Sequence, residues 1–156
     1  MLQDWINRKI QERTEAAIKK ATTRTLPYMF KNPNWANCIA TATDNYGVPV
    51  VLRNSDLMNN PNKYGFEEIK FGDSTDELPD GVLIQDFNKP KDPNTPGHTI
   101  MLVGRTETGA PIYSYSSGRS RKEDMHNKTT SYRFARWDTK VKPKAYRYIG
   151  TPSERK

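Results

Sequence analysis

Three short apolar runs between residues 82 and 118 constrain the fold of this chain most strongly. Residues 82–87 follow a Leu-Pro-Asp-Gly turn signal, and residues 98–104 follow a Pro-Gly pair. Residues 110–118 form the third run, after a short loop that contains glycine. Runs of this length between Gly and Pro turns are typical of β-strands, and the short loop predicts that the last two pair as a hairpin.

Three further segments extend this pattern to a sheet. Residues 69–71 close an apolar stretch, while residues 132–137 and 146–150 alternate between aromatic or aliphatic and polar side chains. Together with the two hairpin strands and the strand that precedes them, these segments predict a mostly antiparallel sheet of about five strands. With the helices described next, the fold class is α+β.

A long amphipathic helix is predicted over residues 3–22. Its apolar stripe is narrow, with Trp5 beside it, and the polar faces carry Lys, Arg and Glu. The helix packs either on its own domain or on a partner, and the pattern leaves both open. The stripe residues are Leu2, Ile6, Ile10, Ala17 and Ala21.

The single cysteine lies in a second, shorter helical segment over residues 35–47. The segment follows Asn-Pro-Asn and ends at Gly47, which suits a helix C-cap. Cys38 is therefore expected in the first turn, where unpaired N–H groups and the helix dipole favour a thiolate. A thiolate is the nucleophilic form of cysteine, so the position suits covalent catalysis.

His98, at the start of the predicted strand 98–104, is the candidate base for this thiol. A cysteine on a helix start, a histidine on a strand start and a polar residue on the next strand follow each other in papain-like sites. The alternatives are a small core cysteine and a structural histidine, each of which is common for such a residue taken alone.

Length and composition limit the other classes. At 156 residues, the chain is one domain with a modest core, since 34% of its residues are hydrophobic. One cysteine excludes an internal disulfide, and one cysteine with two histidines does not complete a four-ligand zinc site. We therefore predict no metal and no cofactor.

No apolar run reaches the length of a transmembrane helix, and the N-terminus has no apolar signal-peptide core. We expect a chain made in the cytoplasm that has no membrane partner. The predicted organisation is an N-terminal helix and linker over residues 1–31, a domain over residues 32–150, and a polar tail over residues 151–156.

The net charge of +7 is unevenly distributed. Residues 1–31 carry a net charge of +4, residues 32–118 of −5, and residues 119–156 of +8. Basic ends suit a polyanion or an acidic protein partner, while a simple solvated surface is the alternative. Nucleic-acid binding is the least favoured interpretation, because it depends only on charge and on interleaved Tyr and Arg residues.

Four segments in this order resemble the NlpC/P60 and CHAP group of papain-like cysteine hydrolases. The resemblance covers roughly residues 35–118. It depends on the order and spacing of the four segments and not on any single motif. The segments are Asn-Cys-Ile-Ala-Thr-Ala at 37–42, Leu-Pro-Asp-Gly-Val-Leu-Ile-Gln at 78–85, Gly-His-Thr-Ile-Met-Leu-Val-Gly at 97–104 and Tyr-Ser-Tyr-Ser-Ser-Gly at 113–118.

The resemblance implies a papain-like fold, with a Cys-bearing helix packed on the sheet, and an amidase or endopeptidase acting on peptidoglycan. Cys38 is then the nucleophile, His98 the general base, and the backbone N–H of Cys38 part of an oxyanion hole. For the third residue, which orients the imidazole, the following strand offers Ser114 or Ser116. A hydroxyl stabilises an imidazolium less than a carboxylate does.

Two functions therefore remain after the sequence is read. The first is a cysteine peptidase or amidase, a cell-wall hydrolase of phage or bacterial origin that is associated with the virion in the phage case. The second is a weakly active or inactive connector of a phage virion that keeps the hydrolase fold. Virion proteins would then bind the N-terminal helix and the basic C-terminal segment.

Overall fold

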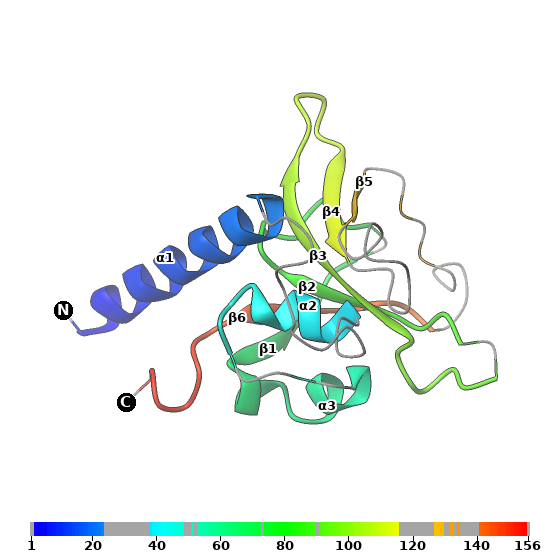
Figure 1. The fold of residues 1–156 in the computed structure, drawn as a ribbon, viewed down its shortest axis with the longest axis horizontal. Coiled ribbons are helices and arrows are strands. Elements are labelled where there is room, and N and C mark those ends of the chain that lie inside the picture. Colours follow the sequence, from blue (N-terminus) through cyan, green and yellow to red (C-terminus); the bar gives the residue numbers. More distant parts are fainter. Residues whose placement is uncertain are drawn as a thin grey trace.

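The computed structural model describes most of the chain. It covers residues 2–23, 38–48, 51, 53–72, 74–89, 91–115, 127–129, 132, 134 and 141–155. Within these residues, three α-helices and a short 3-10 helix surround one sheet (Figure 1). The helical elements are α1 (Leu2–Thr23), α2 (Cys38–Asp44), α3 (Asn54–Asn59) and η2 (Pro61–Tyr64).

The sheet has six described strands in the order β1-β6-β2-β3-β4-β5, and every pair is antiparallel. The predicted α+β class, antiparallel sheet and N-terminal helix are confirmed. The sheet has six described strands where about five were predicted, and β5 lies where the sequence predicted no strand. The strands are β1 (Phe66–Ile69), β2 (Leu83–Asp86), β3 (His98–Arg105), β4 (Pro111–Tyr115), β5 (Asn127–Thr129) and β6 (Lys144–Tyr148).

The predicted strand over residues 132–137 lies mostly outside the described residues. Tyr132 and Phe134 are described, and neither belongs to a strand. Both pack against the apolar cluster that covers one face of the sheet. The aromatic alternation therefore reports the burial of these two rings.

Side-chain alternation along the central strands divides the core into two layers. On one face, Leu83 and Met101 pack with α2 and with the buried alanines of α1. On the other face, Ile84 and Ile100 pack with Tyr113 and the ring of Phe134. In each layer the two strand residues are direct partners across β2 and β3, which places these strands at the centre of both cores.

The helix α1 lies along one side of the molecule, and its N-terminal half extends away from the sheet (Figure 1). Ala17 and Ala21 are fully buried, and their small side chains let the helix approach the core closely. Nearer the N-terminus, the guanidinium of Arg13 pairs with Glu154 at 3.0 Å and also donates to the backbone carbonyl of Tyr46. The helix is therefore held both to the domain and to the residues near the C-terminus.

A close approach between α1 and the turn before β2 requires glycine at position 81. Gly81 has a φ of +98°, and its N–H donates to the carbonyl of Leu102. A Cβ there would lie 2.5 Å from Cγ2 of Thr14 and 2.8 Å from the hydroxyl of Tyr46. This turn thus fixes the spacing of α1, α2 and the sheet.

We predict that Gly81→Ala destabilises the fold far more than Gly109→Ala. Both positions have a positive φ, which costs alanine about 1 kcal/mol, but no atom lies within 4 Å of a Cβ at Gly109. The clash at Gly81 raises the expected loss there to about 3 kcal/mol. Urea denaturation of the two variants measures the difference, and equal losses would contradict the close approach.

Candidate functional site at the start of β3

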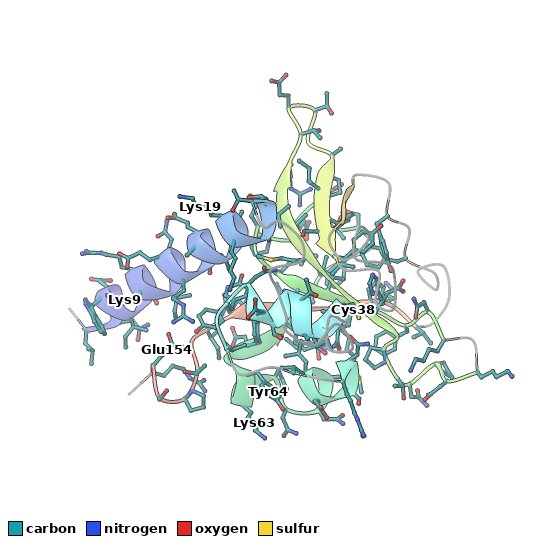
Figure 2. The ribbon with its side chains drawn as sticks, in the orientation of Figure 1. Lys9, Lys19, Cys38, Lys63, Tyr64 and Glu154 are labelled. Carbon is teal, nitrogen blue, oxygen red and sulfur yellow. The ribbon has the colours of Figure 1, made fainter. Side chains whose placement is uncertain are left out.

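Cys38 is the first described residue of α2, and its side chain is buried against the sheet (Figure 2). The predicted position in the first turn of this helix agrees with these bounds. The thiol donates a hydrogen bond to Oδ1 of Asn54, at 3.5 Å. Asn54 begins α3, so the sulfur lies where two helices meet the sheet.

A buried polar network continues from Asn54 into the sheet. Thr99 donates its hydroxyl proton to Oδ1 of Asn54 at 2.6 Å. The amide of Gln85 donates to the backbone carbonyl of Asn54 at 2.8 Å and to the Thr99 hydroxyl at 3.3 Å. Tyr146 completes the chain by donating to Oε1 of Gln85 at 3.2 Å. These bonds fix the environment of Cys38, since a buried polar group left without a partner is costly.

Burial raises the pKa of the Cys38 thiol above its ordinary value of 9.0. Hydrogen bonds from the backbone of Thr99 and from the backbone at Ile39 and Cys38 itself act in the opposite direction and favour the thiolate. Desolvation is the larger effect, so the resting side chain at neutral pH is a thiol.

His98 is the first residue of β3 and is half-buried among aromatic rings. Its ring centroid lies 5.3 Å from that of Tyr115 and 5.7 Å from that of Tyr132. Burial in these surroundings lowers the pKa of His98 to about 4. The resting imidazole is therefore neutral at physiological pH.

Asp86 shares this ring cluster. It is the cross-strand partner of His98 in the pairing of β2 with β3, and it is only 2% exposed. Tyr132 donates its phenolic proton to Oδ2 of Asp86 at 2.8 Å. Burial and the negative charge of Asp86 together raise the pKa of Tyr132, so this hydroxyl remains a donor.

Cys38 and His98 lie at the same end of the sheet but next to different residues. The thiol contacts Thr99 and Asn54, whereas the imidazole contacts Tyr115 and Tyr132. Successive side chains of a strand point to opposite faces, and His98 and Thr99 are successive. No hydrogen bond between Cys38 and His98 occurs among the described residues. Cys38 nevertheless contributes electrostatically to the raised pKa of Tyr132, so the two clusters are close.

The structure does not bring Ser114 to His98, which corrects its predicted place as the orienting residue. Ser114 is the cross-strand partner of Met101, three positions further along β3, and its hydroxyl lies 3.5 Å from the carbonyl of Ala21 in α1. The register of β4 therefore turns Ser114 toward the helix layer. Ser116, the other predicted candidate, lies outside the described residues.

Sequence reasoning missed Asn54, Gln85 and Asp86. Asp86 belongs to a predicted strand, but a loop of ten residues separates that strand from His98, so the register between them had no sequence signal. Asn54 and Gln85 are ordinary polar residues whose burial depends on the packing of α3 against the sheet. No pattern along the chain marks either of them.

Neither a protein-family model, nor a curated protein, nor a solved structure matches this chain. The part of the chain that the structure describes contains no group of three or more His, Cys, Asp or Glu residues placed to hold a metal ion. It also contains no helix that is both long and apolar enough to cross a membrane.

We predict slow alkylation of Cys38 by iodoacetamide at pH 7. Because burial raises the thiol pKa, the rate should lie at least tenfold below that of the urea-unfolded chain and rise through pH 9. The chain has one cysteine, so mass spectrometry reads this site alone. A folded-state rate at pH 7 that equals or exceeds the unfolded rate would contradict this assignment.

We also predict that His98 makes the fold less stable in mild acid. The unfolded imidazole binds a proton near pH 6.5 and the folded one near pH 4, so stability present above pH 6.5 is lost as the pH falls toward 4. Between pH 7 and pH 5 the loss is about 2 kcal/mol.

The matched variant is His98→Gln, which retains a polar side chain but does not titrate. Urea denaturation at pH 7 and pH 5 measures the free energy of unfolding. The loss of this free energy between the two pH values should be about 2 kcal/mol smaller in the variant than in the wild type. Equal pH dependence in the two proteins would show that His98 titrates alike in the folded and unfolded states.

Proposed function

We propose that this protein is a papain-like cysteine hydrolase in which Cys38 is the nucleophile and His98 the general base. The observation that carries the proposal is the environment of the sulfur. Backbone hydrogen bonds at the start of α2 and at Thr99, the residue after His98, all favour a negative charge on it. A core cysteine that serves only to fill space needs no such arrangement.

Both groups are uncharged at rest, so proton transfer accompanies the attack on substrate. The sulfur of Cys38 forms a bond to the carbonyl carbon of an amide while its proton passes to a nitrogen of His98. The imidazolium then protonates the leaving amine as the carbon–nitrogen bond breaks. Water next attacks the thioester, which releases a carboxylic acid and restores the thiol.

The proposal requires the imidazole of His98 to reach the sulfur from its present position between two tyrosine rings. His98 is the first residue of β3, so its side chain lies at the end of the strand. Catalytic hydrogen bonds are often long before substrate binds, so such a movement is compatible with the chemistry.

The proposed substrate is the peptide part of peptidoglycan, and the proposed source is a phage or a bacterium. This part of the proposal rests on the resemblance of the four segments between residues 37 and 118 to the NlpC/P60 and CHAP hydrolases. The net charge of +7 supports it, because cell walls are anionic polymers.

We predict that the full chain releases new amino groups from purified peptidoglycan and that Cys38→Ala abolishes this release. His98→Ala should lower the rate at least 100-fold, since general-base catalysis supplies a factor of about 10²–10⁴. Amine labelling followed by mass spectrometry of the products measures the rate and identifies the bond.

The matched control is Glu107→Gln, which removes an exposed carboxylate from the turn between β3 and β4, at the opposite end of β3 from His98. This variant should cleave at the wild-type rate. Cleavage that persists in Cys38→Ala would contradict the assignment of Cys38 as the nucleophile. If the wild-type chain cleaves no peptidoglycan of any type, the hydrolase proposal fails.

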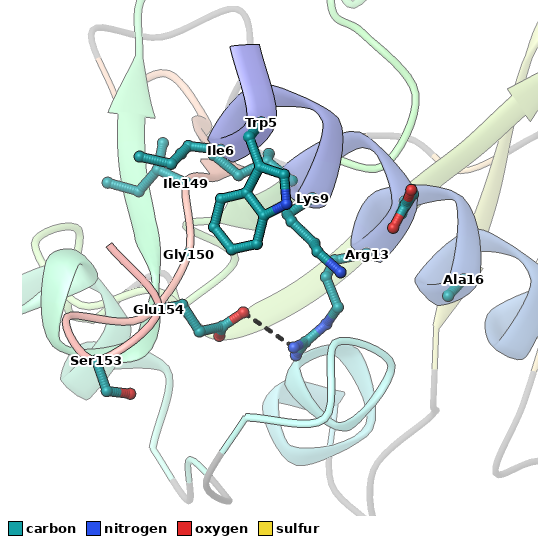
Figure 3. A pocket seen from close by; sticks show the side chains of 11 residues that line it. Trp5, Ile6, Lys9, Arg13, Ala16, Ile149, Gly150, Ser153 and Glu154 are labelled. Atoms are coloured by element: carbon teal, nitrogen blue, oxygen red, sulfur yellow. Dashed lines mark hydrogen bonds and ion pairs between the residues drawn. The ribbon is translucent and has the colours of Figure 1, made fainter. Parts of the chain in front are cut away.

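The second candidate is a virion connector that keeps this fold without chemistry, and one surface of α1 favours it. Leu2 and Trp5 are 72% and 51% exposed, and Trp5 borders a cavity of about 620 Å³ between α1 and the residues near the C-terminus. Figure 3 shows the indole of Trp5 above this cavity, with Arg13 and Glu154 joined on its far side. Exposed apolar side chains beside a cavity are typical of a docking surface.

A further inference from the structure

We propose that Asp86 is the positioning residue of His98, in the place that the sequence assigned to a serine of β4. The catalytic part of this inference rests on the proposed function. The effect of Asp86 on His98 can be tested without measuring activity. The inference depends on one observation: the buried carboxylate of Asp86 lies directly opposite His98, the candidate base, in the pairing of β2 with β3.

The pairing of β2 with β3 places the two side chains together. Asp86 and His98 are cross-strand partners, and the N–H of Gly97 donates to the carbonyl of Asp86 at 2.9 Å. Side chains of direct partners in an antiparallel pair lie on the same face, with Cβ atoms about 4.5–5.5 Å apart. The carboxylate therefore faces the imidazole from within the sheet.

Tyr132 connects the two groups from outside the sheet. Its hydroxyl binds the Asp86 carboxylate at 2.8 Å, and its ring packs against the His98 ring at 5.7 Å. On the other side, the ring of Tyr115 meets the imidazole edge to face at 5.3 Å. At rest the imidazole thus lies between two tyrosine rings, and the hydrogen bond from Tyr132 fixes the direction of the carboxylate.

The chemistry needs this carboxylate because the surroundings otherwise oppose a charged imidazole. The titratable groups described around His98 are Asp86 from β2, Tyr115 from β4, Tyr132, and Cys38 from α2. Of these side chains, only Asp86 is a carboxylic acid. In general, a negative charge within about 4–6 Å of a histidine raises its pKa by about 1–3 units.

The first test is a histidine titration by NMR in the full chain. His126→Gln leaves His98 as the one histidine, and the comparison is between that background, Asp86→Asn and Glu68→Gln. We expect Asp86→Asn to lower the pKa of His98 by about one unit or more, and Glu68→Gln to leave it unchanged. If a variant unfolds in acid, the imidazole shifts at pH 5 give the charged fraction instead.

The second test is the rate of peptidoglycan cleavage. Asp86→Asn should lower kcat about 100-fold with little change in KM, because the carboxylate acts on the base and not on the substrate. The acid limb of the kcat/KM profile should move to lower pH with the pKa of His98. Asp86→Glu keeps the carboxylate and should recover part of the lost kcat. Tyr132→Phe should lower kcat about tenfold.

The outcomes separate this inference from the proposed function. If the Asp86→Asn variant has the same His98 pKa and the same kcat as the wild type, the role of Asp86 is overturned and the hydrolase proposal is left intact. A wild-type chain that cleaves nothing ends the hydrolase proposal, and the titration still decides whether Asp86 acts on His98. If Asp86→Asn does not fold, Tyr132→Phe takes its place. A His98 pKa and a kcat in Tyr132→Phe that both equal those of the wild type would overturn the inference.

Discussion

The antiparallel pairing of β2 with β3 is the interaction on which the rest of the structure depends. Its register runs without interruption from Leu83 opposite Met101 to Asp86 opposite His98. Because side chains alternate, this one register sends the Gln85 and Thr99 pair to the helix layer and the Asp86 and His98 pair to the aromatic layer. A slip of one residue would exchange the two layers and bury every polar group against the wrong partners.

Burial, more than any charged neighbour, sets the resting chemistry of both candidate groups. Desolvation raises the pKa of the Cys38 thiol and lowers that of the His98 imidazole, so both effects remove charge. At the sulfur, backbone hydrogen bonds at the start of α2 and at Thr99 act against this effect. Neither of the two side chains is therefore charged at rest at neutral pH.

Much of the fold could be predicted from the sequence because it depends on local patterns. The apolar stripe of α1, the turn before residue 82 and the apolar run in β3 each specify an element directly. The contacts between elements had no such signal. Asp86 lies opposite His98 through the register across an eleven-residue loop, and Ser114 turns toward Ala21 because of the register of β4. Both outcomes depend on pairing geometry, which the chain does not encode in any short segment.

The two hairpins that flank β3 differ in how firmly they can place a partner for His98. The described pairing of β3 with β4 begins at Met101 opposite Ser114 and is interrupted by a register shift between Leu102 and Gly104. Such irregularities bend a strand and loosen the correspondence between partners. The pairing with β2 is regular up to His98 itself and is buried throughout. The side chain that faces His98 at rest is therefore set more firmly by β2 than by β4.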